Sequence, residues 1–241
     1  MRTLNRIESI RQQEKAYHDA FYGKHQLFEA DTWLEKPAQT VMDCLALLGT
    51  KKPLDVLDLG SGIGRNSIPI ARSISKQGGR VVCVDLLESA ISRLTEYGRV
   101  YGVQNILEIV KSDIGKYRIP PRRFDLILAV SSLEHIATEN DFDRTIMQMV
   151  RGTRSGGINA LIVNTSIQEL DQASGLTRDP MVELNFSSAR LIEKLNGFYA
   201  GWKILNLSSK RLSFPIDRNG RNVNFQTEAL TYAVQKKGSG D

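Results

Sequence analysis

Two kinds of apolar pattern alternate along the chain from residue 54 onward. Short apolar runs rich in β-branched residues are followed by stretches whose apolar residues recur every three or four positions. The runs predict strands at 54–59, 80–85, 106–111, 124–130 and 158–164, and the stretches predict helices around 67–75, 88–101, 141–151 and 188–195. Because parallel strands need helical crossovers, this alternation predicts an α/β fold with a doubly wound, mostly parallel sheet.

The residues before this alternation predict a helical extension over residues 1–53. Apolar residues recur at helical spacing between Leu4 and Phe21, which indicates a helix with one apolar face. A second helix is expected to begin near Pro37, which suits a first helical turn, and to end at Gly49, which suits a C-terminal cap.

The end of the chain departs from the βαβ pattern. Segments 202–211 and 222–235 both have strand character, and the Asn219-Gly220 pair between them favours a turn, so a C-terminal antiparallel hairpin is expected. Residues 165–186 have weak periodicity and are interpreted as a long excursion between sheet elements, of a kind that often carries function. We therefore expect one domain over 54–235, followed by a flexible tail over 236–241.

Composition narrows the class of protein. A chain of 241 residues with 41% hydrophobic content can bury one full core, and no stretch reaches the roughly 18 apolar residues of a membrane helix. The basic first residues lack the apolar segment of a signal peptide, so a cytoplasmic protein with no membrane partner is expected. Cys44 and Cys83 lie in apolar runs and are expected to be buried thiols, with no metal site.

The net charge of +5 raises the question of a nucleic-acid partner. The basic residues are scattered along the chain and do not cluster, which disfavours such a partner and favours a solvated surface. The sequence indicates no oligomeric state.

A glycine-rich loop is the most informative local feature. The apolar run that ends at Leu59 leads into glycines at 60, 62 and 64 and then into a predicted helix. Glycines let the backbone turn sharply and approach a ligand closely, and ligands of open α/β sheets bind at the carboxyl ends of the strands. Polar residues also end the next three predicted strands, namely Asp85, Asp113 and Ser131.

The spacing of the glycines bears on which nucleotide the loop holds. A dinucleotide fingerprint is G-x-G-x-x-G, whereas this loop is G-x-G-x-G and carries Arg65 where the third glycine would stand. Asp85 follows Gly64 by 21 residues, a spacing at which an acid can bind a ribose diol. A nicotinamide-dependent oxidoreductase is therefore disfavoured and stays an alternative.

The stretch Leu57-Asp-Leu-Gly-Ser-Gly-Ile-Gly, with Asp85, Asp113 and Phe124-Asp-Leu-Ile-Leu, resembles the motif series of class I S-adenosylmethionine-dependent methyltransferases over roughly 54–164. The resemblance implies a Rossmann-like fold, S-adenosylmethionine as cofactor and methyl transfer to a small-molecule acceptor. It also implies a cofactor site formed by the methionine-side residues Asp58, Gly60, Ser61 and Gly62, the ribose-binding Asp85, and the adenine-side residues Leu86, Asp113 and Ile114. Ser131, at the end of the fourth strand, completes the expected set.

Within that family the chain is partly similar to tellurite-resistance-type methyltransferases, through Gly-Arg-Asn-Ser after the loop and the segment around Trp202. The His-Arg pair that those enzymes carry before the Asn-Gly turn is replaced here by Leu-Ser-Phe-Pro. A tellurite or selenite acceptor is therefore not expected. Leu133-Glu-His-Ile, after the fourth strand, looks more like enzymes that methylate small organic molecules.

Methyl transfer from a sulfonium is an in-line displacement, and positioning alone can supply roughly 7–11 kcal/mol of the barrier. A hydroxyl or ammonium acceptor must also lose a proton, and His135 is the histidine nearest the predicted site, so we expect it to be a candidate general base. A structural, hydrogen-bonded histidine is the alternative. A noncatalytic protein that binds S-adenosylmethionine also stays open, because binding motifs survive loss of an acceptor pocket.

Aromatic residues of the N-terminal extension are candidates for a second function. Tyr17, Tyr22 and Trp33 are hypothesised to form a lid that excludes water from the reacting centre. The alternative is that they pack the first helix onto the domain.

Overall fold

The computed structural model describes residues 2–49, 52–218 and 220–238, with side chains in the first helix from Arg6 on. The chain forms one mixed sheet in the order β3-β2-β1-β4-β5-β8-β7, with β6 paired to β5 beside this path. The strands are β1 (Asp55–Leu59), β2 (Arg80–Asp85), β3 (Leu107–Lys111), β4 (Phe124–Val130), β5 (Thr153–Asp171), β6 (Thr177–Arg178), β7 (Lys203–Asp217) and β8 (Asn222–Gln235).

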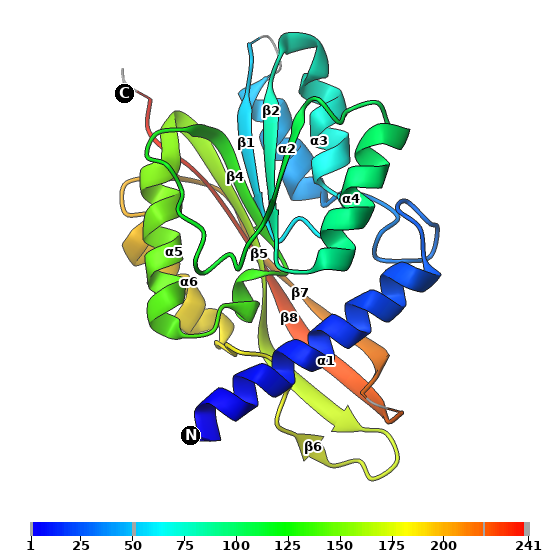
Figure 1. Ribbon diagram of the computed structural model, residues 1–241. Coiled ribbons are helices and arrows are strands. Elements are labelled where there is room, and N and C mark those ends of the chain that lie inside the picture. The colour runs from blue at the N-terminus through cyan, green and yellow to red at the C-terminus, as the bar shows by residue number, and fades with distance from the viewer. Residues whose placement is uncertain (1, 50–51, 219, 239–241) are drawn as a thin grey trace.

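The helices are α1 (Arg2–Lys24), α2 (Gln39–Leu48), α3 (Ser67–Ile74), α4 (Glu88–Val100), α5 (Glu139–Gly152) and α6 (Ser188–Phe198), with short 3-10 turns η1 (Ser75–Gln77) and η2 (Leu133–His135). Helices α2, α3 and α4 lie on one side of the sheet, and α5 and α6 lie on the other (Figure 1). The expected doubly wound, Rossmann-like α/β fold is confirmed.

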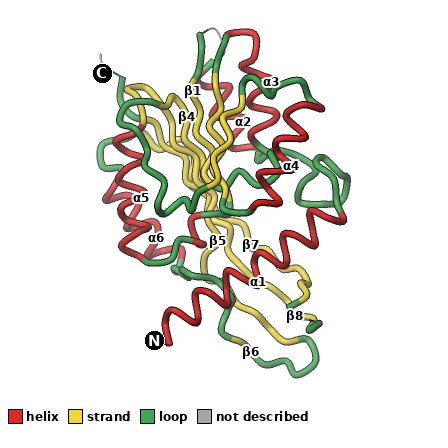
Figure 2. Tube along the Cα trace, viewed as in Figure 1, coloured by secondary structure: helices red, strands yellow, loops and turns green. Residues whose placement is uncertain are grey.

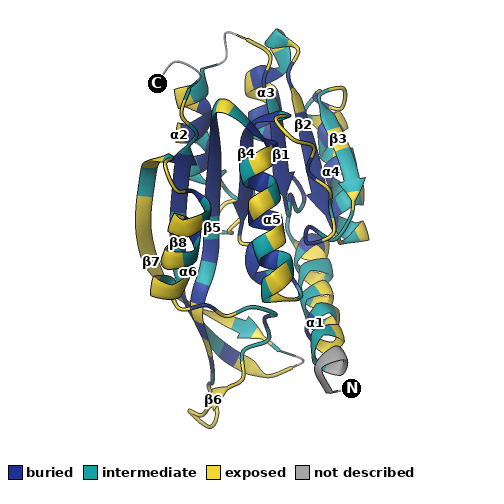
Figure 3. Cartoon of the chain, turned by 90° about the vertical axis from the view of Figure 1, so that its left-hand side faces the viewer, coloured by how far each residue is buried: buried dark blue, intermediate teal, exposed yellow. Residues whose placement is uncertain are grey.

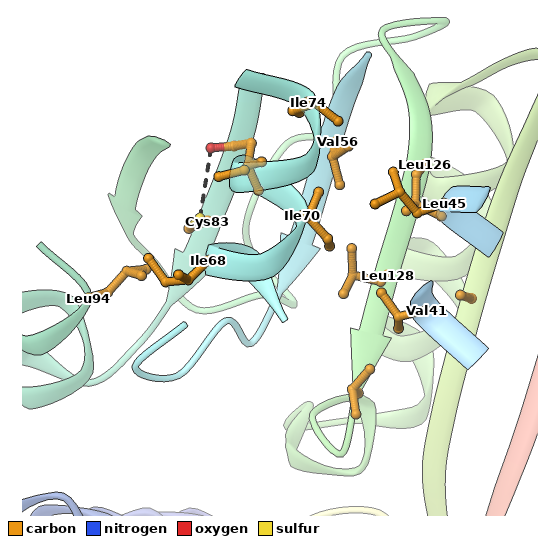
Figure 4. Close-up of a cluster of buried hydrophobic side chains, with 14 of the residues drawn as sticks. Val41, Leu45, Val56, Ile68, Ile70, Ile74, Cys83, Leu94, Leu126 and Leu128 are labelled. Carbon is orange, nitrogen blue, oxygen red and sulfur yellow. Dashed lines mark hydrogen bonds between the residues drawn. The ribbon is translucent and has the colours of Figure 1, made fainter. Parts of the chain in front are cut away.

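The parallel half of the sheet is buried on both faces, which explains its continuous apolar runs. In β1, Val56 packs on the side of α2–α4, whereas its neighbour Leu57 packs on the side of α5 and α6. Figure 4 shows the first of these two cores, in which α2, α3 and α4 direct side chains toward β1 and β4. Cys44 and Cys83 are both buried and free, as expected.

The C-terminal hairpin is also confirmed. Strand β8 pairs antiparallel with both β5 and β7, and β7 forms an exposed edge of the sheet (Figure 3). Asn219 of the expected turn, the side chain of Leu4 and residues 239–241 of the expected tail lie outside the described residues.

The expectation that 165–186 is an excursion between sheet elements is wrong for its first part, because β5 continues to Asp171. After an irregularity between Thr165 and Gln168, the strand stays paired to β8 as far as Asp171 and Val223. The inward positions there include Glu169 and Asp171, which are buried because arginines neutralise them. The pattern therefore lacks the apolar alternation by which strands are recognised.

Strand β7 likewise extends beyond the expected 211 to Asp217, because it pairs with β8 along its whole length. The long strands β5, β7 and β8 project beyond the helices as an antiparallel extension (Figure 2). No helix among the described residues has the length and hydropathy needed to cross a bilayer.

Candidate functional site

The glycine loop follows β1 and is fixed against β2. The backbone N–H groups of Gly60 and Ser61 both donate to the Val84 carbonyl, at 2.8 and 3.1 Å. Gly60 has φ +80°, and a Cβ there would lie 2.3 Å from Cβ of Ser132. A Cβ at Gly62, with φ +53°, would lie 3.1 Å from the Tyr22 hydroxyl oxygen. Gly60 is therefore required by packing within the domain, whereas Gly62 faces α1.

Asp85 connects the loop to the end of β2. Its Oδ2 accepts a hydrogen bond from the Gly62 N–H at 2.8 Å, and its Oδ1 accepts one from the Leu87 N–H at 2.9 Å. Each carboxylate oxygen can accept further hydrogen bonds, and the side chain lies at the sheet edge where nucleotide riboses bind. The structure thus brings together the loop and the acid that the sequence singles out.

Asp58 occupies a different position from Asp85. It is 1% exposed, and its Oδ2 accepts a 2.6 Å hydrogen bond from the Ser67 hydroxyl, while Oδ1 has no hydrogen-bond partner among the described residues. Burial raises the pKa of Asp58 to about 7, against the lowering effect of the Ser67 hydrogen bond. Asp58 therefore supports the loop from beneath, at the start of α3.

Asp113 lies after β3, beside the end of β2. Its Oδ1 accepts the Gly115 N–H at 2.8 Å, and its Oδ2 accepts from the Arg11 guanidinium of α1, also at 2.8 Å. Ile114 is buried, whereas Leu86 is 43% exposed. An exposed apolar side chain beside this carboxylate provides a surface on which a flat heterocycle can pack.

Ser131 ends β4 with φ +51°, and its side chain is exposed. The neighbour that contacts the glycine loop is Ser132, whose hydroxyl donates to the Leu59 carbonyl at 2.7 Å. Sequence reasoning missed Ser132, because only the fold shows which of two consecutive serines turns inward. Ser131 follows β4 and Asp113 follows β3, so β2 and β1 lie between these two residues in the sheet.

His135 ends the 3-10 turn η2 that follows β4. Its Nδ1 lies 3.1 Å from Oε2 of Glu183, and the side-chain exposures are 34% and 2%. Burial lowers the pKa of His135, but the hydrogen bond with Glu183 and the charges of Glu14 and Glu134 outweigh it and raise the pKa to about 9. The imidazolium form therefore predominates at neutral pH, and that form donates hydrogen bonds.

Glu134 precedes His135 and has a structural environment. It is 1% exposed, and its Oε1 accepts hydrogen bonds from the Asn164 side chain at 2.6 Å and from the Asn164 backbone N–H at 3.2 Å. Burial raises the pKa of Glu134. This carboxyl ties η2 to β5.

Helix α1 crosses the carboxyl ends of the parallel strands (Figure 1). Arg11 bonds to Asp113 as described above, Asp19 accepts from the Ser89 hydroxyl of α4 at 2.5 Å, and Tyr22 lies against Gly62. The helix thus covers the strand ends from Asp113 to the glycine loop.

Aromatic contacts extend this cover to the segment after α1. Phe21 stacks on Trp33 with a centroid distance of 5.1 Å, and Tyr22 lies 6.2 Å from the same ring. Arg65, which replaces the third glycine of a dinucleotide fingerprint, lies over Trp33 at 5.6 Å and donates to its carbonyl at 2.9 Å. The Arg65 guanidinium therefore holds the segment around Trp33 in place.

Two carboxylates and two imidazoles come together where α1 meets η2, and we call Glu14 and His18 of α1, His135 of η2 and Glu183 the imidazole–carboxylate cluster. His18 Nε2 lies 3.7 Å from Oε2 of Glu14, and Arg11 Nε lies 3.5 Å from Oε1 of Glu183. No group of three or more metal-ligating side chains converges among the described residues. Sequence reasoning missed three of the four, because only the fold brings the Glu14–His18 pair of α1 next to the His135–Glu183 pair.

Arg218, just after β7, holds this cluster from the side of the antiparallel extension. Its guanidinium donates to Glu14 at 2.9 Å and to Glu169 at 2.9 Å. Burial raises the pKa of Glu14, but His135, His18 and Arg218 outweigh it and lower the pKa below its ordinary value. A cavity of about 310 Å³ lies next to Arg218 and is lined also by Tyr17, Phe21 and His25.

Buried polar atoms of the loop and of α1 have no hydrogen-bond partner among the described residues, namely Ser61 Oγ and His18 Nδ1. Buried polar groups are normally satisfied, so such a concentration indicates a place for a polar ligand. Together with the glycine loop and the two strand-end acids, these atoms fit an adenosine linked to an amino-acid moiety.

Residues 56–157 match a family model described as "Methyltransferase domain". Two curated relatives are a sterol 24-C-methyltransferase from Gibberella zeae, 33% identical over 92 residues, and a ubiquinone biosynthesis O-methyltransferase from Rickettsia canadensis, 28% identical over 110 residues. The alignments cover 38% and 44% of this chain but only 23% and 40% of those proteins.

Solved structures share the fold along most of the chain. TehB from Haemophilus influenzae superposes with a TM-score of 0.62 at 22% identity, covering 92% of this chain and 67% of TehB. The expected partial similarity to tellurite-resistance-type proteins is thereby confirmed at the level of the fold.

Proposed function

From the match of residues 56–157 to a methyltransferase domain, we propose that the protein is a class I S-adenosylmethionine-dependent methyltransferase that methylates a small-molecule acceptor. The observation that carries the proposal is the bond between Asp85 and the Gly62 N–H, which holds a ribose-binding acid against a glycine loop at the sheet edge. When bound, S-adenosylmethionine supplies an electrophilic methyl group on a cationic sulfur.

We assign the binding of this cofactor to residues at the ends of four adjacent strands. Asp85 accepts hydrogen bonds from the ribose hydroxyls, Asp113 accepts from the adenine amino group, and Leu86 packs on the base. The rest of the proposed set comprises Gly60, Ser61 and Gly62 along the methionine moiety, Asp58 beneath it, Ile114 behind the base and Ser131 at the end of β4. Helix α1 excludes water from the reacting atoms, which strengthens the electrostatic interactions inside.

The acceptor is proposed to bind next to the methionine side of this site, under α1 and against the imidazole–carboxylate cluster. His135 belongs to that wall, and its catalytic role stays a prediction. With the pKa of His135 raised to about 9, the ring is a hydrogen-bond donor at neutral pH and accepts a proton only in alkaline solution. Its proposed role is therefore to hold an acceptor oxygen.

The comparisons favour an organic acceptor, since the relatives' names refer to a sterol and to ubiquinone biosynthesis. The two buried free thiols suit a reducing compartment, and we propose a cytoplasmic protein. Scattered basic residues give no footprint for a nucleic acid.

The test is calorimetric titration of S-adenosylhomocysteine into the protein and into Asp85→Ala, with NAD as a control ligand. Loss of hydrogen bonds to a charged acceptor is worth about 1.5–3 kcal/mol each, so affinity should fall roughly 10- to 100-fold or more in the variant. Asp43→Ala, which removes an exposed carboxylate on α2, should bind like the parent. Tighter binding of NAD would instead support an oxidoreductase, and binding without turnover on any acceptor would support a noncatalytic binding protein.

A further inference from the structure

His18 lies on the face of α1 that covers the site. It is one helical turn before Tyr22, whose ring centroid is 5.3 Å away and whose hydroxyl lies against Gly62. It is one turn after Glu14, whose Oε2 is 3.7 Å from His18 Nε2. The imidazole therefore lies between the glycine loop and the other members of the imidazole–carboxylate cluster, where the proposed methyl donor and the acceptor have to meet.

One nitrogen of His18 lacks a partner. Nδ1 is buried and accepts or donates no hydrogen bond among the described residues, while Nε2 faces the Glu14 carboxylate. A tautomer with the proton on Nε2, directed at Glu14, leaves a lone pair on Nδ1. Glu14 would then stabilise the imidazolium that forms when Nδ1 takes a proton, as a carboxylate does for a catalytic histidine elsewhere.

The charged groups around His18 come from three elements. Glu14 and Asp19 flank it on α1, Asp85 ends β2, and His135 ends η2. Burial lowers the pKa of His18, and the repulsion from His135 lowers it further, against the raising effects of the three carboxylates. The two histidines of the site thus differ in charge at neutral pH, because His18 is neutral and His135 is cationic.

Aromatic rings also surround His18. Tyr17 lies edge-on at 5.2 Å, and Trp33 lies edge-on at 6.2 Å. These rings, with Tyr22, offer flat apolar surfaces on which an aromatic ligand can pack. The acidity of the hydroxyl group favours the same class of ligand. A phenol has a pKa of about 10, against about 15.7 for water, so a weak base deprotonates a phenol far more readily.

Resting on the proposed methyltransferase function, we propose that His18 is the proton acceptor of the reaction and that the substrate is a small aromatic molecule with an ionisable hydroxyl group, whose oxygen binds between His18 and His135. The O–H bond breaks as its proton passes to Nδ1 of His18. An electron pair of the oxygen forms the bond to the methyl carbon, and the carbon–sulfur bond breaks with its pair left on sulfur. His135 donates a hydrogen bond to the oxygen while it carries negative charge.

The first test is methylation of phenol, catechol and 4-hydroxybenzoate, with aniline as the amine comparison, across pH 5–10. The pH profile should show an acid limb below pH 6.5, because His18 must be deprotonated, and His18→Gln should lose about 100-fold or more in kcat together with that limb. The matched control is His25→Gln, which removes the third histidine of the chain, paired with Glu29 away from the cluster. It should stay within two-fold of the parent.

The second test needs no turnover. In the protein saturated with S-adenosylhomocysteine, proton–carbon NMR of the three histidine rings, assigned with His18→Gln, His25→Gln and His135→Gln, should show His18 titrating below pH 6.5. Addition of catechol should shift the His18 and His135 ring signals and leave the His25 signals in place.

The outcomes distinguish failure of this inference from failure of the proposed methyltransferase function. An absence of S-adenosylhomocysteine binding would overturn the proposed methyltransferase function. Binding of S-adenosylhomocysteine without methylation of any hydroxyl probe, or methylation of aniline alone, would overturn the acceptor class. Full turnover in His18→Gln, or a limb near pH 9 that vanishes in His135→Gln, would remove His18 as the proton acceptor.

Discussion

Two aspartates next to the glycine loop differ in role: one supports the loop and the other is placed to bind a ligand. Asp58 is enclosed beneath the glycine loop, where burial raises the pKa to about 7, whereas Asp85 lies at the strand end and is tied to two backbone N–H groups. Local sequence identifies both as acids beside a glycine loop. It does not show which one faces a ligand, since that depends on packing of α3 and β2.

The glycine at position 60 allows a matched stability test. Gly60→Ala places a Cβ 2.3 Å from Ser132 at φ +80°, so it adds overpacking of about 1–3 kcal/mol to the roughly 1–2 kcal/mol cost of left-handed backbone. Gly78→Ala, at φ +76° with nothing within 4 Å, adds only the backbone cost. Thermal unfolding should rank Gly60→Ala clearly below Gly78→Ala, and equal melting temperatures would contradict the close approach.

The ion pair of His135 predicts a pH-dependent stability. Its folded pKa of about 9 exceeds the ordinary value of 6.5, so the stabilisation is complete below pH 6.5 and is lost as pH rises through 9. Because the ring is about a third exposed, solvent screening limits the gain to about 1–3 kcal/mol. Urea unfolding should show a gap between the parent and His135→Gln at pH 6 that closes by pH 10, and a constant gap would refute the pair.

At the scale of elements, the sequence predicts the parallel strands closely and the antiparallel extension poorly. Strands β1, β2 and β4 are buried on both faces and stand out as apolar runs. The outer part of β5 buries Glu169, which is 2% exposed and neutralised by Arg218 from the turn after β7. No local pattern reveals such long-range pairing. For the same reason sequence analysis found Asp85 and the loop, but missed His18 and Glu183.

Arg218 allows a test of how the antiparallel extension is attached to α1. It is 11% exposed at the side chain and pairs with both Glu14 and Glu169, so Arg218→Ala removes the arginine partner of the buried Glu169 and of the largely buried Glu14, and should cost about 3–5 kcal/mol. Arg178→Ala removes a more exposed arginine paired with Asp171 and should cost about 1 kcal/mol or less. Chemical denaturation measures both, and similar losses would show that Arg218 is not the tie between α1 and the hairpin.

At the scale of the whole molecule, α1 joins the two halves of the sheet. Arg11 attaches it to the parallel half through Asp113, and Glu14 attaches it to the antiparallel half through Arg218. The cover over the site is thus held by ion pairs to both halves, together with the buried side chains of Ile10 and Tyr22. Much of this attachment is polar, and we therefore expect α1 to open more easily than the helices that pack on the sheet.

Hydrogen exchange should report this opening directly. Saturation with S-adenosylhomocysteine is expected to slow amide exchange along α1 about ten-fold or more, since a ligand held beneath the helix favours its closed position. Helix α2, which lies on the sheet face, should exchange at an unchanged rate. Unchanged exchange in α1 under saturating ligand would mean that the helix does not close over the site.

The position of α1 has a consequence for the timing of turnover. A single helix lies over both the glycine loop and the imidazole–carboxylate cluster, so neither substrate reaches its place, and neither product leaves, without the same displacement. Exchange of the cofactor and exchange of the acceptor are then coupled. Steady-state kinetics should follow a compulsory order in which the molecule bound deeper enters first and departs last. We expect departure of the second product to be the slowest step of such a cycle.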